Sequence, residues 1–270
     1  MERDVSVVIP LYNSKDSIVD VLKGIESQTR KDCIKDVVVV NDGSSDGSEI
    51  VVEEYQKISS LNIVLINKQN GGVAAARNRG VLEAGTVEWI AFCDSDDVWM
   101  PHKLERLFEC LDSYPETDCI GSAYSEQPLR IGSKIISTLH KGTVKDILIS
   151  NFPQPSTVIM KKTVFDEIGG FDERQRYAED GNFFLKVAAN YNLYYLPEQL
   201  IVYGYGKRAF GVGGLSSNLK GMYDGNVKNM KEMYSMKYIS WRFYITMRLY
   251  HWAKYCRRII ITKLTHTKTN

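Results

Sequence analysis

Hydrophobic and polar positions alternate in blocks through about the first 110 residues of the chain. Four apolar runs, each rich in β-branched residues, predict buried strands, and the stretch that follows each run predicts a helix. The expected elements are, in chain order, strand 5–10, helix 14–27, strand 36–41, helix 49–58, strand 61–67, helix 73–84, strand 87–93 and helix 101–111. This alternation predicts an α/β protein with a Rossmann-like, mostly parallel sheet flanked by helices.

The pattern becomes less regular after residue 115. Strands are expected at 118–124, 156–161 and 193–203, and helices near 143–150 and 180–190. A Gly-rich loop follows at 204–214, and from Asn226 to the end the chain contains neither Gly nor Pro, which predicts a C-terminal helical extension. We therefore expect an α/β domain over residues 1–219 and a helical tail over residues 220–270.

The charge of the chain is close to neutral in total but uneven along its length. The whole chain has 34 basic and 33 acidic residues, for a formal net charge of +1, which argues against a protein that coats nucleic acid. Residues 1–219 carry a net charge of −8, whereas residues 220–270 carry +9. A basic tail on an acidic body needs an explanation of its own.

Cysteine usage and hydropathy limit the cellular setting. The five cysteines are scattered without a C-x-x-C pair, so neither a zinc knuckle nor a disulfide framework is indicated. The four histidines show no metal-binding spacing, and no apolar run approaches the ~18 residues of a spanning helix. We expect a cytoplasmic protein, either free or peripheral on the inner face of the membrane.

The sharpest local feature is an acidic cluster directly after the fourth predicted strand. Asp94, Asp96 and Asp97 place three carboxylates in four residues. Ligands of parallel sheets bind beyond the carboxyl ends of the strands, and a hard divalent cation such as Mg²⁺ or Mn²⁺ would relieve the repulsion between these groups. The alternative is a solvated acidic turn.

Two further candidates follow other strands. Asp42, after the second strand, is placed to accept hydrogen bonds from a base or ribose, or to shape an Asx turn in NDGSSDGS. Arg77 follows Gly71 and Gly72 at a predicted helix entrance, where it suits a phosphate or base contact; the alternative is a glycine turn with surface arginines. The first strand ends without G-x-G-x-x-G, which argues against a dinucleotide site.

A second acidic site lies at Glu179 and Asp180. A general base needs a carboxylate close to an acceptor hydroxyl, and Asp180 is a candidate for this role. The residue could equally cap the helix that is predicted to start there.

In order, the chain contains VSVVIPLYN, VVVVNDGSSDGS, NGGVAAARNRG, WIAFCDSDDVWMPHKL, GGFDE and AEDGNFFLKV. Over about residues 4–205 this succession resembles family-2 glycosyltransferases of the GT-A fold. The later stretch AFGVGGLSSN is similar to bacterial enzymes that build O-antigen or capsule repeat units. The order of the motifs is specific, although each alone is less so.

The resemblance implies a nucleotide-sugar donor, most often a UDP-sugar, and Mn²⁺ or Mg²⁺ as cofactor. It implies a donor-binding half over residues 1–100 and an acceptor half over 101–219. The implied roles are as follows: Pro10, Tyr12, Asp42 and Arg77 at the nucleoside, Asp96 on the metal, Asp94 on ribose or metal, Asp97 on the donor sugar or in support of the turn, Asp180 as base and Glu179 positioning a substrate.

The same resemblance implies an inverting single displacement, so that an α-linked donor yields a β-glycoside. The chain lacks Q-x-x-R-W, the mark of processive synthases of this family, which favours transfer of one sugar to a free glycan or a polyprenyl-diphosphate-linked saccharide. Loop 204–214 is a candidate closing segment. It contains no histidine, so a side-chain contact with the diphosphate there would need Lys207 or Arg208.

The tail is amphipathic over residues 238–264. Its aromatic and aliphatic residues fall mostly on one side of a helix and its basic residues mostly on the other, a pattern suited to an anionic membrane surface. The alternative is a helix that packs on the domain or at a homodimer contact.

Two rival functions are compatible with parts of the sequence. FCDSDDV matches the D-x-D-x-[TV] pattern of haloacid-dehalogenase-type phosphatases, with Asp94 as nucleophile, but that motif normally follows the first strand rather than the fourth. A non-catalytic sugar-nucleotide binding module is the third reading, and the presence of two acidic sites argues against it.

Overall fold

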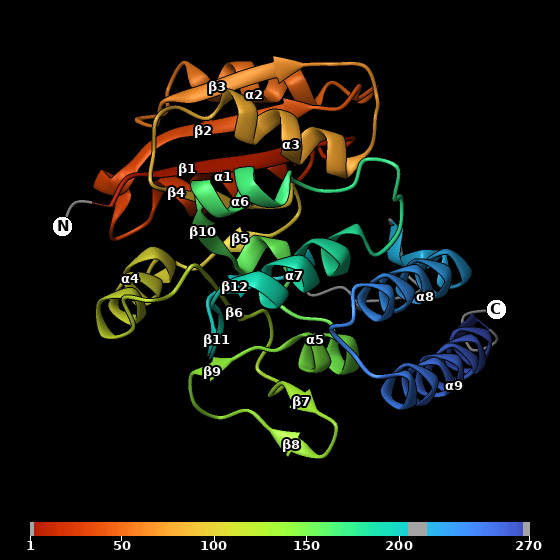
Figure 1. The fold of residues 1–270 in the computed structure, drawn as a ribbon. Helices are drawn as coiled ribbons and strands as arrows, with labels where there is room; N and C mark the ends of the chain where they lie inside the picture. Colours follow the sequence, from red (N-terminus) through yellow and green to blue (C-terminus); the bar gives the residue numbers. More distant parts are fainter. Residues whose placement is uncertain (1–2, 205–214, 267–270) are drawn as a thin grey trace.

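The computed structural model describes residues 3–204 and 215–266. An eight-stranded sheet with helices on both faces forms its centre (Figure 1). The strands are β1 (Val5–Leu11), β2 (Ile34–Asn41), β3 (Ile63–Asn67), β4 (Trp89–Phe92), β6 (Cys119–Ala123), β9 (His140–Lys141), β10 (Ile159–Lys161) and β11 (Leu193–Gln199). The helices are α1 (Ile18–Glu26), α2 (Ser48–Gln56), α3 (Val73–Glu83), α4 (Lys103–Ser113), α5 (Val144–Ser150), α6 (Lys162–Ile168), α7 (Glu179–Asn190), α8 (Leu219–Ser235) and α9 (Trp241–His266).

The order of strands in the sheet is β3-β2-β1-β4-β10-β6-β11-β9. The first four are parallel, as the alternating pattern predicts. β10 is antiparallel to both of its neighbours, β11 is parallel to β6, and β9 is antiparallel to β11. The prediction of a mostly parallel sheet flanked by helices is confirmed. Because β1, β2 and β4 point the same way, the loops that follow them meet at one edge.

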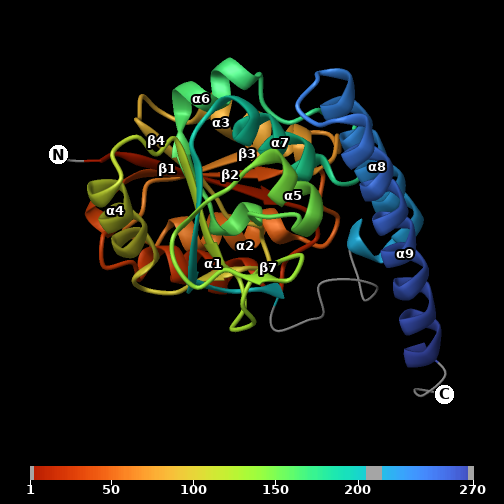
Figure 2. The same ribbon diagram turned by 60° about the horizontal axis from the view of Figure 1, so that its bottom comes forward.

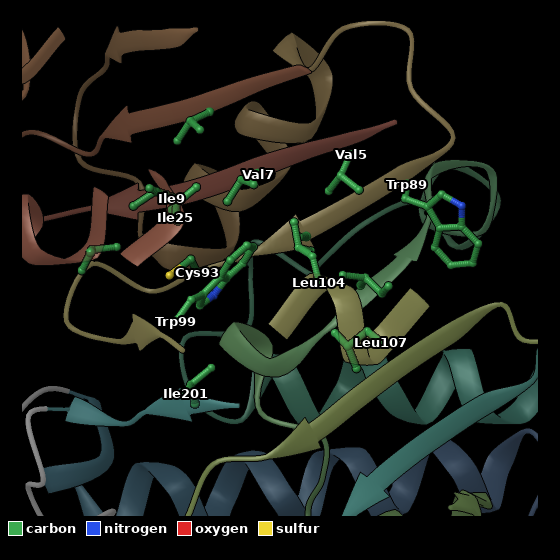
Figure 3. Close-up of a cluster of buried hydrophobic side chains, with 14 of the residues drawn as sticks. Val5, Val7, Ile9, Ile25, Trp89, Cys93, Trp99, Leu104, Leu107 and Ile201 are labelled. Carbon is green, nitrogen blue, oxygen red and sulfur yellow. The ribbon is translucent and has the colours of Figure 1, made fainter. Parts of the chain in front are cut away.

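The core has two halves, one on each face of the sheet. Alternate side chains of β1 point to opposite faces, and all seven residues of this strand are buried, as expected of a continuous apolar run. Val5, Val7 and Ile9 pack with α1, α2 and α4, together with Trp99 (Figure 3). Val8 packs on the other face, with side chains from α3 and from α5 to α9.

The structure departs from the sequence expectations mainly in short elements. Strands β5 (Val98–Trp99), β7 (Arg130–Ile131) and β8 (Lys134–Ile135) were not expected, because a two-residue strand is too short to show a period. Strand β12 (Ile201–Val202), which pairs with β5, is the end of the expected strand 193–203, which the structure interrupts at Leu200. Pro155 begins a short 3₁₀ helix, Pro155–Thr157, so that only the last three residues of the expected strand 156–161 extend.

The C-terminal segment forms two helices rather than one. Helix α8 starts at Leu219, before the glycine-free stretch, where Asn218 caps it by accepting from the Gly221 N–H. Gly221 and Gly225 lie against Tyr177: a Cβ on Gly221 would sit 2.6 Å from the tyrosine ring, and one on Gly225 would overlap its carbonyl oxygen. Helix α9 then runs alongside α8 at the side of the body (Figure 2).

Both C-terminal helices join the second half of the core. Met230 and Met233 of α8 and Met247 of α9 are buried there with the phenylalanines of α7. His251 of α9 is also buried, and its Nε2 donates to the carbonyl of Leu148 at 2.7 Å. None of the helices that the structure describes has both the length and the apolar character needed to cross a bilayer.

Candidate functional site

A first cavity of about 670 Å³, called here the donor-side cavity, opens at the carboxyl edge of the sheet. The end of β1, the residue after β2, the entrance of α3 and the turn after β4 all border it. Five of the predicted site residues line it together: Pro10, Tyr12, Asp42, Asp94 and Asp96. The expectation that the residues after each parallel strand converge is therefore met by these positions.

Asp42 is buried and fastens the end of β2 to the entrance of α3. Its Oδ1 accepts from the Gly71 N–H at 2.9 Å, its Oδ2 accepts from the Gly72 N–H at 2.8 Å, and Lys68 donates to Oδ1. Asx-type contacts in this loop are made instead by Asn41, whose Oδ1 accepts from the Ser44 N–H at 3.0 Å, and by Asp46, whose Oδ1 accepts from the Ser48 N–H at 3.0 Å. Asp42 thus shapes the cavity wall with both of its oxygens.

The three carboxylates after β4 point to different places. Asp96 is exposed at the donor-side cavity, and Asp94 lines the same cavity. Asp97 is only 1% exposed and does not line this cavity. It accepts from the Gly204 N–H at 2.7 Å and from Gln154 Nε2 at 3.1 Å, so it supports the turn. Burial, followed by the charge of Asp94, raises the pKa of Asp97 to about 7.

Arg77 differs from both expectations placed on it. Its side chain is neither on the wall of the donor-side cavity nor on the surface; it is 3% exposed. Nη2 donates to Asp94 Oδ1 at 2.7 Å, and Nη1 donates to Glu179 Oε1 at 3.2 Å. The guanidinium also lies over the ring of Phe171, 5.2 Å from its centroid. Arg77 therefore joins the two acidic sites through one buried cation.

Glu179 and Asp180 begin helix α7. The helix cap is Ala178, in the left-handed conformation with φ 55°, so Asp180 is not the capping residue. Burial, followed by the charge of Asp180, raises the pKa of Glu179 to about 7, against the lowering effect of Arg77. Burial also raises the pKa of Asp180. The Gly181 N–H, which donates to Asp180 at 2.7 Å, and the charge of Arg77 both act to lower this pKa. Raised carboxyl pKa values of this kind are typical of groups that take part in proton transfer.

Four supporting residues were not found from the sequence. Ser156 Oγ accepts from the Asp94 N–H at 2.8 Å, and Gln154 Nε2 approaches Asp94 Oδ2 at 3.4 Å as well as Asp97. Gln175 and Asn229 donate to the carbonyl of Ala178 at 3.0 and 2.9 Å, so α8 helps to hold the strained start of α7. Isolated amides and hydroxyls in loops and helices carry no spacing signal that would have singled them out.

A second cavity of about 320 Å³, called here the α9-side cavity, lies between the body and the two C-terminal helices. Asp180, Gln154 and Tyr203 line it from the body, and residues of α8 and α9 close it from outside. Because Gln154 contacts Asp94, which lines the donor-side cavity, the two cavities are linked through one hydrogen bond. The predicted residues Lys207 and Arg208 lie outside the described residues.

The donor-side cavity offers two carboxylates to a cation. No group of three or more histidine, cysteine, aspartate or glutamate side chains surrounds a common point in residues 3–204 and 215–266. Asp94 and Asp96 suit Mg²⁺ or Mn²⁺ instead, because such ions are often bound by one or two carboxylates together with oxygens of a substrate diphosphate. The residues present therefore fit a cation that is shared with a phosphorylated ligand.

Comparison with solved structures identifies the fold. The mannosyltransferase PcManGT from Pyrobaculum calidifontis, solved with GDP-Man and Mn²⁺, superposes with a TM-score of 0.69 at 20% identity, over 87% of this chain and 65% of its own. Residues 1–349 of Staphylococcus aureus TarS, solved with UDP-GlcNAc, give 0.67 at 24% identity, over 84% of this chain and 66% of their own. The architecture is the expected GT-A fold.

Comparison with curated sequences identifies the family. Bacillus subtilis TuaG, named for teichuronic acid biosynthesis, is 36% identical over 105 residues, or 39% of this chain and 40% of TuaG. The B. subtilis glycosyltransferase EpsH is 30% identical over 173 residues, or 64% of this chain and 46% of EpsH. The matched parts thus span about half the length of these relatives. The family model for glycosyl transferase family 2 matches residues 6–167. The chain belongs to glycosyl transferase family 2.

Proposed function

We propose that this protein transfers one sugar from a nucleotide-sugar donor to a hydroxyl group of a glycan acceptor. The observation that carries the proposal is the position of Arg77 between two acidic sites, one at each cavity. Asp94 lines the donor-side cavity and Asp180 lines the α9-side cavity, and Arg77 is bonded to Asp94 and to Glu179, the neighbour of Asp180. A donor in the first cavity and an acceptor in the second would meet at this junction.

In the proposal, the donor-side cavity holds the nucleotide. Pro10 and Tyr12 border the nucleoside, and Asp42 holds the loop of Gly71 and Gly72 against it. Asp94 and Asp96 bind Mn²⁺ or Mg²⁺, which when present neutralises charge that develops on the departing diphosphate. The ligands of PcManGT and TarS support a nucleotide-sugar donor, and we infer a UDP-sugar.

The acidic residues of α7 carry the proton transfer. The carboxylate of Asp180 accepts the proton of the acceptor hydroxyl as that oxygen forms a bond to the anomeric carbon. The bond between the anomeric carbon and the diphosphate oxygen breaks, and its electron pair leaves with the nucleoside diphosphate. One displacement inverts the anomeric centre, so an α-linked donor gives a β-glycoside. Glu179, held by Arg77, positions the substrates at this point.

We further propose that the acceptor belongs to bacterial surface polysaccharide synthesis, such as O-antigen or capsule, and that it is a polyprenyl-diphosphate-linked saccharide. The relative TuaG, named for teichuronic acid biosynthesis, supports a polysaccharide role. The absence of Q-x-x-R-W from this sequence supports addition of a single sugar rather than processive synthesis.

A donor panel tests the proposal. Purified protein is incubated with UDP-, GDP- and dTDP-sugars and lipid-diphosphate sugar acceptors, with Mn²⁺, with Mg²⁺ or with EDTA, and products are measured by mass spectrometry. We expect transfer from one nucleotide class, loss of that transfer in EDTA and recovery when Mn²⁺ is restored. Absence of transfer and of donor hydrolysis with every donor would overturn the proposal. Release of phosphate from simple esters without a nucleotide sugar would support the phosphatase alternative.

We also propose that α9 rests on an anionic membrane surface at the inner face of the membrane. Its outward side exposes an apolar stripe, defined as Trp241, Ile245, Leu249, Trp252 and Ile260. Two of these are tryptophans, which favour the interface between lipid and water, and the exposed Arg242 lies beside them. The net charge of +9 over residues 220–270 favours anionic lipid over a second copy of the same basic segment.

Vesicle binding tests the membrane contact. We expect Trp241→Ser with Trp252→Ser to reduce cosedimentation with phosphatidylglycerol vesicles at least about 10-fold, because interfacial binding follows the buried apolar area. Circular dichroism checks that the variant is folded. Substitutions are used instead of truncation of α9, because truncation would remove the buried Met247 and His251 from the core. Vesicle binding that is unchanged by the double substitution would contradict the proposal. A native protein that is a dimer in solution, when the doubly substituted protein is a monomer, would also contradict it.

A further inference from the structure

The inward side of α9 carries basic residues that the membrane proposal does not use. Lys254 and Arg258, one turn apart, line the α9-side cavity together with His251 and with Asp180 of α7. This side of the helix faces away from the apolar stripe, and both basic side chains are partly buried. The two cations therefore border the same cavity as the proposed catalytic base.

The charges around Lys254 are unbalanced. Among the described residues no ion pair joins Lys254 to a carboxylate, and the lining of the cavity includes a single acid, Asp180. The sequence contains no acid after Glu232 and none in 205–214. Burial, then the charges of Arg258 and Arg257, lower the pKa of Lys254 to about 8. A bound anion would offset both the cost of burying the charged Lys254 side chain and its repulsion by the two arginines.

The remaining walls suit an uncharged polar body attached to that anion. Tyr223 of α8 and Tyr255 of α9 stack with their ring centroids 5.0 Å apart, and Tyr124 packs against Tyr203 at 5.2 Å. Asn151 and Asn226 add amide groups to the lining. Aromatic faces with a few hydrogen-bonding groups are a common lining of pockets for small organic ligands.

We infer that the α9-side cavity is the acceptor site and that Lys254 and Arg258 bind a phosphoryl group carried by the acceptor. This inference rests on the proposed function, because it assigns the cavity of Asp180 to the acceptor. Two adjacent cations match the roughly two negative charges of a phosphomonoester or diphosphate, and Arg binds such oxygens through paired N–H groups. The donor diphosphate belongs to the other cavity, beside Asp94 and Asp96.

Kinetics with soluble acceptors test the inference without a membrane. The variants are Lys254→Met and Arg258→Gln, and the control is Arg257→Gln, an exposed arginine of the same helix that does not line the cavity. For a phosphorylated acceptor we expect the acceptor KM to rise about 10- to 100-fold in both variants, as for loss of a charge-assisted hydrogen bond. The donor KM, donor hydrolysis and all parameters of the control should stay within about twofold.

The acceptor panel identifies the source of the phosphoryl group. One arm is a sugar linked through diphosphate to a short prenyl chain, the second is a glycan with a phosphomonoester, the third is a neutral octyl glycoside and the fourth is a glucuronide. A variant effect confined to the first or to the second arm supports a lipid-linked or a glycan-borne phosphate, respectively. The inference would be overturned if the substitutions raised the acceptor KM as much for the neutral glycoside as for the phosphorylated acceptors. It would also be overturned if the largest rise were for the glucuronide, or if no acceptor showed a rise.

A binding measurement separates this inference from the proposed function. Geranyl diphosphate is titrated into the protein by calorimetry in EDTA, without donor. We expect binding that weakens about 10-fold or more in Lys254→Met and is unchanged in Arg257→Gln. Such binding by a protein that turns over no donor would contradict the transferase proposal but leave the anion site standing. Equal binding by all three proteins would overturn the anion site.

Discussion

Replacing Asp180 by Asn is expected to lower the turnover number of sugar transfer by about 10²- to 10⁴-fold, the usual contribution of a general base. Asn retains an oxygen that can accept the Gly181 N–H, so the start of α7 is preserved, but it cannot take a proton from the acceptor hydroxyl. The donor KM should change less than about threefold, because Asp180 lines the α9-side cavity and not the donor-side cavity. Initial-rate kinetics with the identified donor measure both quantities.

The pH profile gives a second readout of the same residue. Burial raises the pKa of Asp180 above the ordinary value, and only the ionised form accepts a proton. Turnover by the native protein should therefore fall as pH decreases through this raised pKa, and the two carboxyl groups of Glu179 and Asp180 should titrate as a pair. The control is Asp166→Asn, an exposed carboxylate on α6, which should keep full turnover. Retention of full transfer by Asp180→Asn would show that the base lies elsewhere.

Replacing Arg77 by Met is expected to lower the free energy of unfolding by about 3–5 kcal/mol, the typical effect of removing one partner from a buried ion pair. The substitution leaves the buried carboxylate of Glu179 and the partly buried carboxylate of Asp94 without the guanidinium that now donates to both. Activity should fall as well, since Arg77 holds Asp94 and Glu179, which belong to the two acidic sites. Denaturant unfolding at pH 7 measures the stability change.

The loss of stability should depend on pH in a defined direction. Arg77 lowers the pKa of Glu179, so its removal raises that pKa further above about 7. The folded variant then takes up a proton as pH falls, which neutralises the buried carboxyl, so the destabilisation should be smaller at pH 5 than at pH 8. Adding Glu179→Gln to Arg77→Met should recover part of the stability for the same reason.

A matched arginine of the same helix provides the control for Arg77. Arg79 is partly exposed and pairs with Glu83 at the surface, so Arg79→Met should cost no more than about 0.5 kcal/mol. If Arg77→Met were as stable as Arg79→Met, the buried pair would not hold the two acidic sites together, and the role assigned to Arg77 would be wrong.

Local patterns were sufficient for the parallel half of the fold and for one wall of the site. An apolar run such as 36–41 is buried from both faces wherever it lies in the sheet, so its composition alone identifies a strand. The residues after such strands necessarily meet at one edge, which is why the sequence alone groups Tyr12, Asp42, Asp94 and Asp96. The short strand β5 could not be found, since two residues show no period.

The remainder of the site depends on contacts between segments distant in the chain. Arg77 looked like a surface or phosphate-binding residue because its burial comes from packing against Phe171 and α7, which no local pattern reveals. Helix α9 has apolar residues on two of its sides, and its sequence does not indicate which side packs against the body.

The amino-acid sequence thus specifies on its own the longer strands, the loop carboxylates and the family, since these follow from local hydrophobic periods and from motifs in order. The three-dimensional packing settles how the charges are used. Burial of Met247 and His251 turns the apolar stripe of α9 outward and brings Lys254 and Arg258 to the cavity of Asp180. The orientation of a helix is set by the free energy of burying one face against a specific surface, and that surface exists only once the chain has folded.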